Sequence, residues 1–367
     1  MEEKKLTYAE ALLLERVISS PPRTGRVLVA GNRSGVVVAE AMRRWPDASV
    51  YAHAFDFHHA RAIRDRLSES GCSTEGVLCT PTVAPAGEAA PYTAALFMTT
   101  PRSMPAELVL DQLQDIYLNL AEGGELLAAF EGDPDAALKT MKLVWANVHV
   151  EKKAKHAVLF RAVRRGDLKK VRTFSADWTA SVPGGDGLVF TSCPGCFCHR
   201  RPDDGGLALA EVAARELSAD AAGRPLRLLD MGCGCGLVGL LAADAVRRAG
   251  GVPSLTLVDS HARATAATRL NADRAGFPDA EVILSDDGLP RGRVGEFDVF
   301  VGNPPYYSDY RIADVFLETA YRALRPGGVC LTVVKTATGL LALQEKWFRT
   351  AEVIKRRGYC VLRSIRN

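Results

Sequence analysis

The sequence lacks any run of about 18 consecutive apolar residues, the length that a membrane-spanning helix needs. Its first five residues carry both acidic and basic side chains with no apolar core behind them, so we expect no secretory signal. The chain also lacks a strong charge of one sign, because 46 Lys and Arg stand against 43 Asp and Glu. A net charge of +3 does not by itself identify nucleic acid as a partner. We therefore expect no contact with a membrane.

A disulfide framework is lacking as well. Nine cysteines are spread over 367 residues, several of them beside glycines in short predicted loops, whereas disulfide-rich proteins are short and dense in cysteine. With 47% apolar residues the chain can bury a large core without crosslinks. We expect reduced thiols and a cytoplasmic location, and the length predicts two domains.

The two halves of the sequence repeat the same order of landmarks. Alternating strand and helix patterns in each half predict two α/β domains, each with a mainly parallel sheet covered on both faces. The closing segments 148–163 and 351–366 are typical of β-hairpins with no clear helix before them, which predicts an antiparallel strand at each sheet edge. The repeated pairs, at nearly constant separation, are residues 26–35 with 227–236, Asp56 with Asp259, Gly123 with Gly327, and Trp145 with Trp347.

Basic residues gather where the first half ends. Residues 142–172 carry ten Lys or Arg against two acids, and the equivalent stretch 346–366 carries seven against one. Exposed basic hairpins are most often solvated faces, but two in equivalent places favour contact with a phosphate backbone. The candidate side chains for this contact are Lys152, Lys153 and Lys155. We place the domains at 1–165 and 188–367, joined by a linker over 166–187.

A glycine-rich turn follows the first strand of the second half. Glycines in alternation at 232, 234 and 236 allow a ligand to approach the backbone at the carboxyl end of a parallel strand. Asp259 ends the next strand, which suits a carboxylate that accepts both ribose hydroxyls of a nucleoside. Asp286, after a third apolar stretch, can accept from an adenine amino group or can be a solvated turn residue. The predicted cofactor-binding residues are Asp230, Gly232, Gly234, Gly236, Asp259, Asp286 and Asn303.

The sequence Asn303-Pro304-Pro305-Tyr306-Tyr307 follows an apolar strand pattern at 299–301. The prolines cannot continue the strand, so Asn303 is predicted at the strand's end before a stiff turn. The Asn303 side-chain oxygen and the Pro304 carbonyl can both accept from one exocyclic amino group, and Tyr306 can stack on its ring. Asn303, Pro304 and Tyr306 are the predicted catalytic residues, and Pro305, Tyr307 and Phe197 are predicted to bind the substrate.

The equivalent positions of the first half lack this chemistry. Val29 stands where the second half has Asp230, Arg33 stands in place of Gly234, and 99–102 reads Thr-Thr-Pro-Arg in place of Gly-Asn-Pro-Pro. An arginine in the glycine turn is expected to crowd a ligand. We predict a degenerate first copy that serves as a scaffold and, through its basic residues, as a surface for a phosphate backbone.

With these motifs, residues 230–328 resemble a class I S-adenosylmethionine-dependent methyltransferase. The whole chain resembles the bacterial ribosomal RNA guanine-N2 methyltransferases of the RsmC/RlmG kind, which join a degenerate copy of the fold to an active one. The segments that carry this resemblance, besides the Asn-Pro-Pro-Tyr motif, are Pro194-Gly-Cys-Phe197 and Asp204-Gly-Gly206. The family often has Phe-His after the two prolines, where this chain has Tyr306-Tyr307.

The resemblance implies two tandem Rossmann-like domains with seven-stranded sheets, the first of them degenerate. It also implies methyl transfer from S-adenosylmethionine to the N2 amino group of a guanine in ribosomal RNA, most simply 16S rRNA, by a monomer. Adenine-N6 and protein glutamine-N5 methyltransferases share Asn-Pro-Pro-Tyr and stay open as alternatives. A further alternative is a ribosome assembly factor whose two methyltransferase folds are both inactive.

Four thiol or imidazole groups between Cys193 and His199 suggest a Cys₃His zinc site. Structural zinc usually joins two ligand pairs that are separated in sequence, and adjacent Cys198 and His199 side chains are expected to diverge. We predict a substrate loop with incidental cysteines and no metal.

Overall fold

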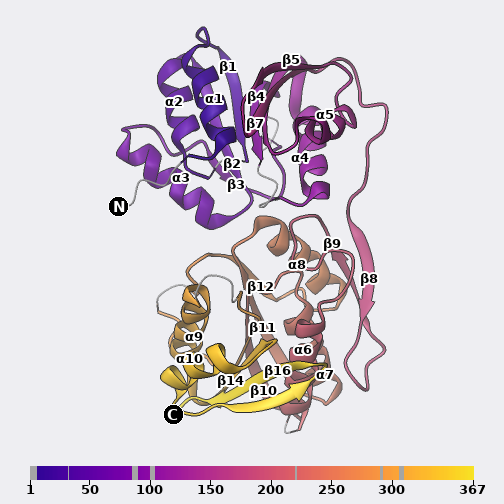
Figure 1. Ribbon diagram of the computed structural model, residues 1–367. Coiled ribbons are helices and arrows are strands. Elements are labelled where there is room, and N and C mark those ends of the chain that lie inside the picture. Colours follow the sequence, from indigo (N-terminus) through magenta and orange to yellow (C-terminus); the bar gives the residue numbers. More distant parts are fainter. Residues whose placement is uncertain are drawn as a thin grey trace. The chain divides into compact units, whose positions relative to one another are not determined.

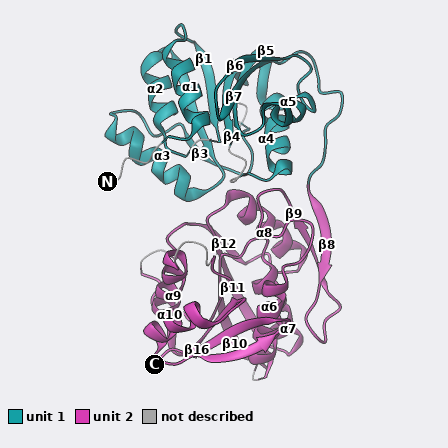
Figure 2. Cartoon of the chain, viewed as in Figure 1, with its two compact units in different colours: residues 1–174 teal, residues 175–367 magenta. Residues whose placement is uncertain are grey.

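The computed structural model describes residues 6–31, 33–84, 90–99, 104–219, 221–289, 292–305 and 310–367. The chain divides into two compact units, residues 1–174 and 175–367 (Figure 2). The division falls inside the range 166–187, which the sequence suggested as a linker. Part of that range belongs to the second unit, because β8 (Ala176–Ala180) pairs antiparallel with β9 (Leu188–Ser192).

The first unit contains a seven-stranded sheet of order β3-β2-β1-β4-β5-β7-β6. Strands β1 to β5 run parallel, and β7 pairs antiparallel with both β5 and β6. Its strands are β1 (Gly25–Ala30), β2 (Ala48–Ala54), β3 (Val77–Cys79), β4 (Tyr92–Thr99), β5 (Leu120–Glu131), β6 (Val148–Lys153) and β7 (Ala157–Val163). Its helices are α1 (Tyr8–Ile18), α2 (Val36–Arg44), α3 (Phe57–Glu69), α4 (Ala106–Asn119) and α5 (Pro134–Lys142).

The second unit repeats this order as β12-β11-β10-β13-β14-β16-β15, which confirms the predicted duplication of one α/β fold (Figure 1). Its strands are β10 (Pro225–Met231), β11 (Val252–Asp259), β12 (Glu281–Leu284), β13 (Phe297–Gly302), β14 (Leu324–Val334), β15 (Glu352–Arg356) and β16 (Tyr359–Ile365). Its helices are α6 (Asp204–Ser218), α7 (Leu237–Arg248), α8 (Ala262–Arg274), α9 (Arg311–Ala323) and α10 (Thr338–Phe348).

Each sheet is buried on both faces, and its central strands contain consecutive apolar residues that fill both cores. In β1, Val27 and Val29 face a core shared with α1 to α3, while Leu28 and Ala30 face a core shared with α4 and α5. Side chains of a strand alternate between the two faces, so a continuous apolar run fills both cores. Strand β10 does the same: Leu228 packs with α6 to α8 and Leu229 with α9.

The predicted hairpins close both sheets, but a helix precedes each of them. The sequence indicated no clear helix there, whereas α5 and α10 connect the last parallel strand to the hairpin. Helix α5 is nine residues long. The sequence features that mark its start are Asp133, which caps the N-terminus, and Pro134 in the first turn. Short helices of this kind show too few turns for periodicity to reveal them.

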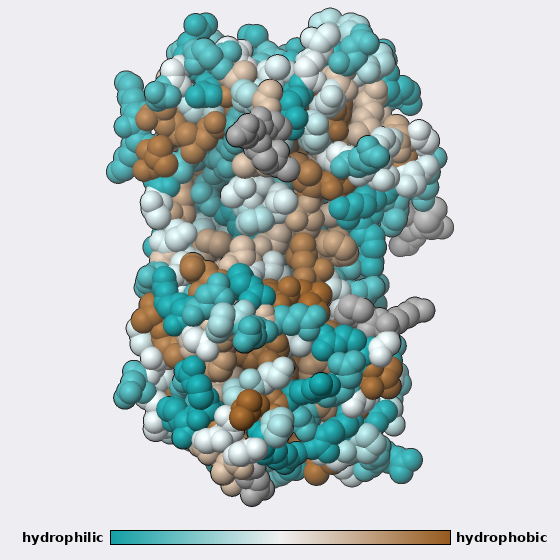
Figure 3. Space-filling view, turned by 180° about the vertical axis from the view of Figure 1, so that it is seen from behind, coloured by the Kyte–Doolittle hydropathy of each residue, from teal (hydrophilic) through white to brown (hydrophobic). Residues whose placement is uncertain are grey.

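No helix in the described ranges is long and apolar enough to cross a membrane. On the face shown in Figure 3, hydrophilic and hydrophobic residues are interspersed in small patches.

Candidate active site

The candidate site lies at the carboxyl end of β10, where the strand order of the second sheet switches from one side to the other. Strand β10 lies between β11 and β13, both parallel to it, and the chain proceeds from β10 to β11 on one side before it returns to β13 on the other. Met231 pairs with Val258 and with Gly302, so the glycine turn and Asn303 begin at the same sheet edge. Ligands of open α/β sheets bind at such a switch point.

The glycine turn needs its glycines for two different reasons. Gly232 has φ +70°, and a Cβ added there would lie 2.8 Å from the Phe316 ring, so a side chain is excluded by conformation and by space. Gly234 has φ +60°, but no atom lies within 4 Å of an added Cβ. The Gly234 backbone therefore faces open space that a ligand can enter.

Asp230 and Asp259 hold the turn from its two ends. The buried Asp230 carboxylate accepts the Gly239 N–H at 2.8 Å, which ties β10 to the first turn of α7. Asp259 accepts the Gly234 N–H through Oδ2 at 2.8 Å and the His261 N–H through Oδ1 at 2.9 Å. Each carboxylate oxygen has lone pairs to spare, so Asp259 can still accept ribose hydroxyls. The contact of Asp230 with a cofactor stays a prediction.

Burial raises the pKa of Asp230 to about 7; the Gly239 N–H opposes this shift, and the nearby Asp259 carboxylate adds to it. Because the folded-state pKa exceeds the usual value of 3.8, this group's contribution to stability is fully present below about pH 4 and is lost as the pH rises through 7. We expect the unfolding temperature of the wild type to fall, relative to that of Asp230→Asn, between about pH 5 and about pH 8. The asparagine stays neutral and keeps an acceptor for Gly239. Thermal unfolding of both proteins over this range measures the effect, and a constant difference between them would contradict it.

Asp286 lies near Asp259 at the same sheet edge. Asp259 pairs with Leu284 in the β11–β12 ladder, and the Ser285 N–H donates to the Asp259 carbonyl at 2.9 Å. Asp286 follows directly and is half-buried. The glycine turn thus supplies backbone N–H donors, and Asp259 and Asp286 supply carboxylate acceptors. Recognition of a nucleoside needs both kinds of group.

Asn303 follows β13, and its side chain is held by a distant part of the chain. Its Nδ2 donates to Asp203 Oδ2 at 3.0 Å, and the same oxygen accepts the Gly206 N–H at 2.6 Å as the N-cap of α6. Because Nδ2 is bound to Asp203, the side-chain oxygen Oδ1 of Asn303 lies on the opposite branch of the planar amide. Pro304 is buried and Pro305 half-buried, whereas Tyr306 and Tyr307 lie outside the described residues.

Sequence reasoning missed Asp203. The resemblance was placed on Asp204-Gly-Gly206, but Asp203-Asp-Gly205 has the same spacing, and it is Asp203 that caps α6 and contacts Asn303. The Asp204 side chain is 71% exposed, 3.9 Å from Arg357. A capping residue before the apolar run of α6 was the available signal.

The loop between β9 and α6 carries the cysteines. Cys193 and Cys196 have their sulfur atoms 3.7 Å apart, and both approach the Arg263 carbonyl oxygen. A hydrogen bond with Cys193 and burial raise the pKa of Cys196. Among the described residues, no cluster of three or more His, Cys, Asp and Glu has metal-binding geometry. Phe197, the predicted substrate contact, is 67% exposed.

The first unit has a different construction at the equivalent turn. Val29 is fully buried in the apolar core, where Asp230 stands in the second copy. A Cβ at Gly31 would lie 1.9 Å from the Met98 carbonyl oxygen, so this turn packs against β4. Arg33 is exposed, and residues 100–102 of the predicted Thr-Thr-Pro-Arg segment lie outside the described residues.

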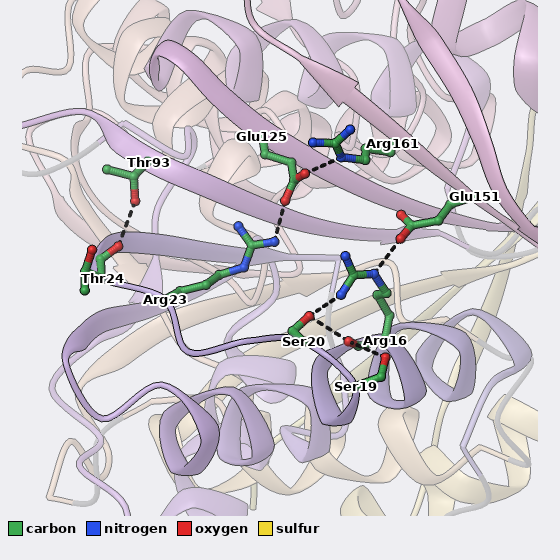
Figure 4. A network of polar contacts seen from close by, with 9 residues as sticks. All are labelled: Arg16, Ser19, Ser20, Arg23, Thr24, Thr93, Glu125, Glu151 and Arg161. Carbon is green, nitrogen blue, oxygen red and sulfur yellow. Dashed lines mark hydrogen bonds and ion pairs between the residues drawn. The ribbon is translucent and has the colours of Figure 1, made fainter.

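Ion pairs occupy many of the basic side chains of both hairpins. In the first unit, Arg161 of the hairpin and Arg23, which precedes β1, pair with Glu125, and Arg16 of α1 pairs with Glu151 of the hairpin at 2.5 Å (Figure 4). These residues line a surface cavity of about 680 Å³. Lys152 pairs with Glu15 at 2.5 Å, while Lys153 and Lys155 are exposed. In the second unit, Arg356 and Arg357 both pair with Glu211 of α6, and Arg363 pairs with Glu216.

Comparison with known proteins relates the second unit to methyltransferases. Residues 187–363 match the model of the methyltransferase small domain. The chain is 37% identical over 155 residues to the ribosomal RNA small subunit methyltransferase C of Pseudomonas aeruginosa (strain LESB58), 40% of this chain and 42% of that protein. The first relatives are thus matched over less than half of their own length.

Other relatives match over most of the chain. Identity is 28% to the ribosomal RNA small subunit methyltransferase C of Hahella chejuensis, over 85% of each chain. It is 26% to the ribosomal RNA large subunit methyltransferase G of P. aeruginosa (strain UCBPP-PA14), over 90% of this chain and 84% of that one.

Among solved structures, the T. thermophilus 16S rRNA N2 G1207 methyltransferase RsmC in complex with AdoMet and guanosine has a TM-score of 0.78. It is 20% identical and is covered over 93% of its length by the whole of this chain, a likeness that shows the fold alone. Residues 187–363, which contain the glycine turn and Asn303, therefore match the methyltransferase small domain, and over 85% to 90% of its length the chain is similar to ribosomal RNA methyltransferases of the RsmC and RlmG kind.

Proposed function

We propose that this protein methylates the exocyclic N2 amino group of a guanine in ribosomal RNA, most simply in the 16S rRNA. The observation that carries the proposal is the fixed amide of Asn303, at the end of β13 and beside the glycine turn. Its carbonyl oxygen and the carbonyl of Pro304 form a pair of acceptors suited to an amino group with two N–H donors. The relatives are named as ribosomal RNA methyltransferases, which supports the same substrate class.

The cofactor is held, in this proposal, by the turn at Gly232, Gly234 and Gly236 and by the carboxylates that flank it. Asp259 accepts the ribose hydroxyls, and Asp286 accepts the adenine amino group. Asp230 acts on the turn through its bond to Gly239. When bound, S-adenosylmethionine supplies a methyl group that is electrophilic because it is attached to a sulfonium sulfur.

The amino group of guanine is a poor nucleophile, and Asn303 and Pro304 have to orient it for the reaction. The lone pair of a guanine amino group is delocalised into the ring. Acceptance of both N–H bonds by Asn303 and Pro304 fixes the nitrogen so that its lone pair points at the methyl group. The new N–C bond would form as the methyl–sulfur bond breaks and leaves its electron pair on sulfur; the positive charge that develops on the nitrogen would be stabilised by the two acceptor oxygens. The extra proton of the methylated amino group then leaves to solvent, so no dedicated base is needed.

Further residues are proposed to bind the RNA. Tyr306 stacks on the target base, with Phe197, Pro305 and Tyr307 beside it. The first unit serves as a scaffold and RNA-binding surface through Lys152, Lys153 and Lys155. One chain carries the complete site, so we propose that the protein acts as a monomer.

Replacing Lys152, Lys153 and Lys155 together by glutamine is expected to lower RNA affinity and to flatten its salt dependence. Each lost phosphate contact removes about 0.7–0.9 units from the slope of log K against log salt concentration. Lys152→Gln alone should have the smallest effect, because Glu15 already pairs with this lysine. RNA binding measured at several salt concentrations tests this, with cofactor affinity as the control. An unchanged slope would show that these lysines are only a solvated face.

Transfer of a tritiated methyl group tests the proposed substrate class. The wild type should label unmodified ribosomal RNA or ribosomal subunits, and label should be absent from protein. Label on a protein glutamine would instead support the glutamine-N5 alternative. Cofactor binding without any transfer to RNA or protein would support an inactive assembly factor.

A further inference from the structure

Asp203 connects two parts of the active site that lie 100 residues apart in the chain. Its Oδ2 accepts the Gly206 N–H at 2.6 Å, which caps α6, and it accepts from Asn303 Nδ2 at 3.0 Å. Its other oxygen, Oδ1, lies 3.7 Å from the Cys198 sulfur. One carboxylate therefore contacts the helix, the cysteine loop and the asparagine.

We propose that Asp203 is a positioning residue that sets the orientation of the Asn303 amide. This inference rests on the proposed function, because it concerns how Asn303 meets the amino group of the substrate. The two branches of an asparagine amide have nearly the same shape, but one accepts hydrogen bonds and the other donates them. Asn303 can serve an amino substrate only if its carbonyl oxygen, and not its NH₂ group, faces the substrate.

An ionised carboxylate selects that orientation because it can only accept. Asp203 stabilises the arrangement in which the NH₂ group of Asn303 points at it, through a charge-assisted hydrogen bond. In the flipped arrangement two acceptors, Asn303 Oδ1 and Asp203 Oδ2, would face each other. The flipped amide would also present N–H donors to the N–H donors of the substrate. Both Asp203 and the substrate amino group therefore favour the same orientation of the Asn303 amide.

The first turn of α6 is built around this carboxylate. A Cβ at Gly205 would lie 3.1 Å from Asp203 Oδ2, and one at Gly206 would lie 3.3 Å from it. The same added atoms would be 3.1 Å from the Tyr359 ring and from Leu237, respectively. The two glycines therefore leave the space that the carboxylate occupies. The positive end of the helix dipole of α6, which is 15 residues long, also favours a negative charge at its N-cap.

Two substitutions separate positioning from capping. Asparagine and serine both cap helices well, so Asp203→Asn and Asp203→Ser should each preserve the start of α6. Only asparagine reaches far enough for its side-chain oxygen to accept from both Gly206 and Asn303, as the Asp203 Oδ2 atom does. Asp204→Asn is the matched control, because it removes a neighbouring charge in the first turn that is largely exposed.

We expect Asp203→Ser to lower the single-turnover methylation rate by about 10- to 100-fold, while Asp203→Asn stays within about five-fold of the wild type. Cofactor affinity and unfolding temperature should change little in any of the three variants. In an Asn303→Ala background, Asp203→Ser should cause no further loss, because the group that it positions is gone. A wild-type rate for Asp203→Ser, or an equal loss in both backgrounds, would overturn the proposal.

A second readout does not depend on activity. The side-chain ¹⁵N–¹H₂ signals of Asn303, identified by their disappearance in Asn303→Ala, report on the hydrogen bond directly. We expect Asp203→Ser to shift these signals and to speed their exchange with water, while Asp203→Asn and Asp204→Asn change them less. Unchanged signals in Asp203→Ser would refute the positioning role. A wild type with these signals as expected but without methyl transfer would refute the proposed function instead.

Discussion

Replacing Asn303 by alanine is expected to lower the single-turnover methylation rate by about 10²–10³, the loss that follows removal of one preorganised group that stabilises the transition state. The affinity for S-adenosylmethionine should stay near that of the wild type, because Asn303 acts on the target amino group. Calorimetry and single-turnover rates at saturating RNA separate the two effects. A wild-type rate would remove Asn303 from the active site.

The aspartate substitution sharpens this test. Asn303→Asp keeps the size and an acceptor oxygen, but it replaces the NH₂ group that donates to Asp203. Two carboxylates would then face each other, and a negative charge would stand near the sulfonium. We expect this variant to be at least as impaired as alanine. Adding Asp203→Asn removes one negative charge but should recover little of the rate, because the branch that faces residue 303 also accepts the Gly206 N–H and has to remain an oxygen.

Replacing Asp259 by alanine has the second large effect, on the cofactor. The variant loses a charged acceptor for the ribose hydroxyls and the partner of the Gly234 and His261 N–H groups. Hydrogen bonds to charged groups contribute roughly 1.5–3 kcal/mol, so the dissociation constant should rise by about 10- to 150-fold. Asp259→Asn is the matched control and should lose less, because its amide oxygen still accepts. Calorimetric titration of all three proteins measures these constants, and unchanged affinity in Asp259→Ala would contradict the assignment.

The same titration counts the sites. We expect one cofactor per chain, because the first copy has buried Val29 in place of Asp230 and packs its turn against β4. Two bound cofactors per chain would contradict a degenerate first copy.

Much of the fold was predictable because its signals are local. Continuous apolar strands such as 27–30 require two covered faces, and a turn of alternating glycines marks the end of β10. The repeated landmarks predicted two copies, and the two sheets have the same strand order. The helices α5 and α10 were not predicted, because they are short. A capping residue alone is a weaker signal for a helix than apolar periodicity over several turns.

The parts of the site that the sequence did not reveal depend on tertiary contacts. The partner of Asn303 lies 100 residues earlier, and two adjacent aspartates fit the same motif spacing. Likewise, residues 346–366 look strongly basic in sequence, but Arg356 and Arg357 both pair with Glu211 of α6, which offsets one of their two charges. Surface ion pairs of this kind are weak, so such arginines can still exchange partners.

Nucleoside mass spectrometry of the RNA product is the most direct test of the proposed reaction. Unmodified ribosomal RNA or subunits would be incubated with S-adenosylmethionine and the wild-type protein, recovered, digested and compared with an Asn303→Ala reaction. We expect N2-methylguanosine in the wild-type sample and its near absence in the variant sample. N6-methyladenosine in place of N2-methylguanosine, or no methylated nucleoside above the variant's level, would contradict it.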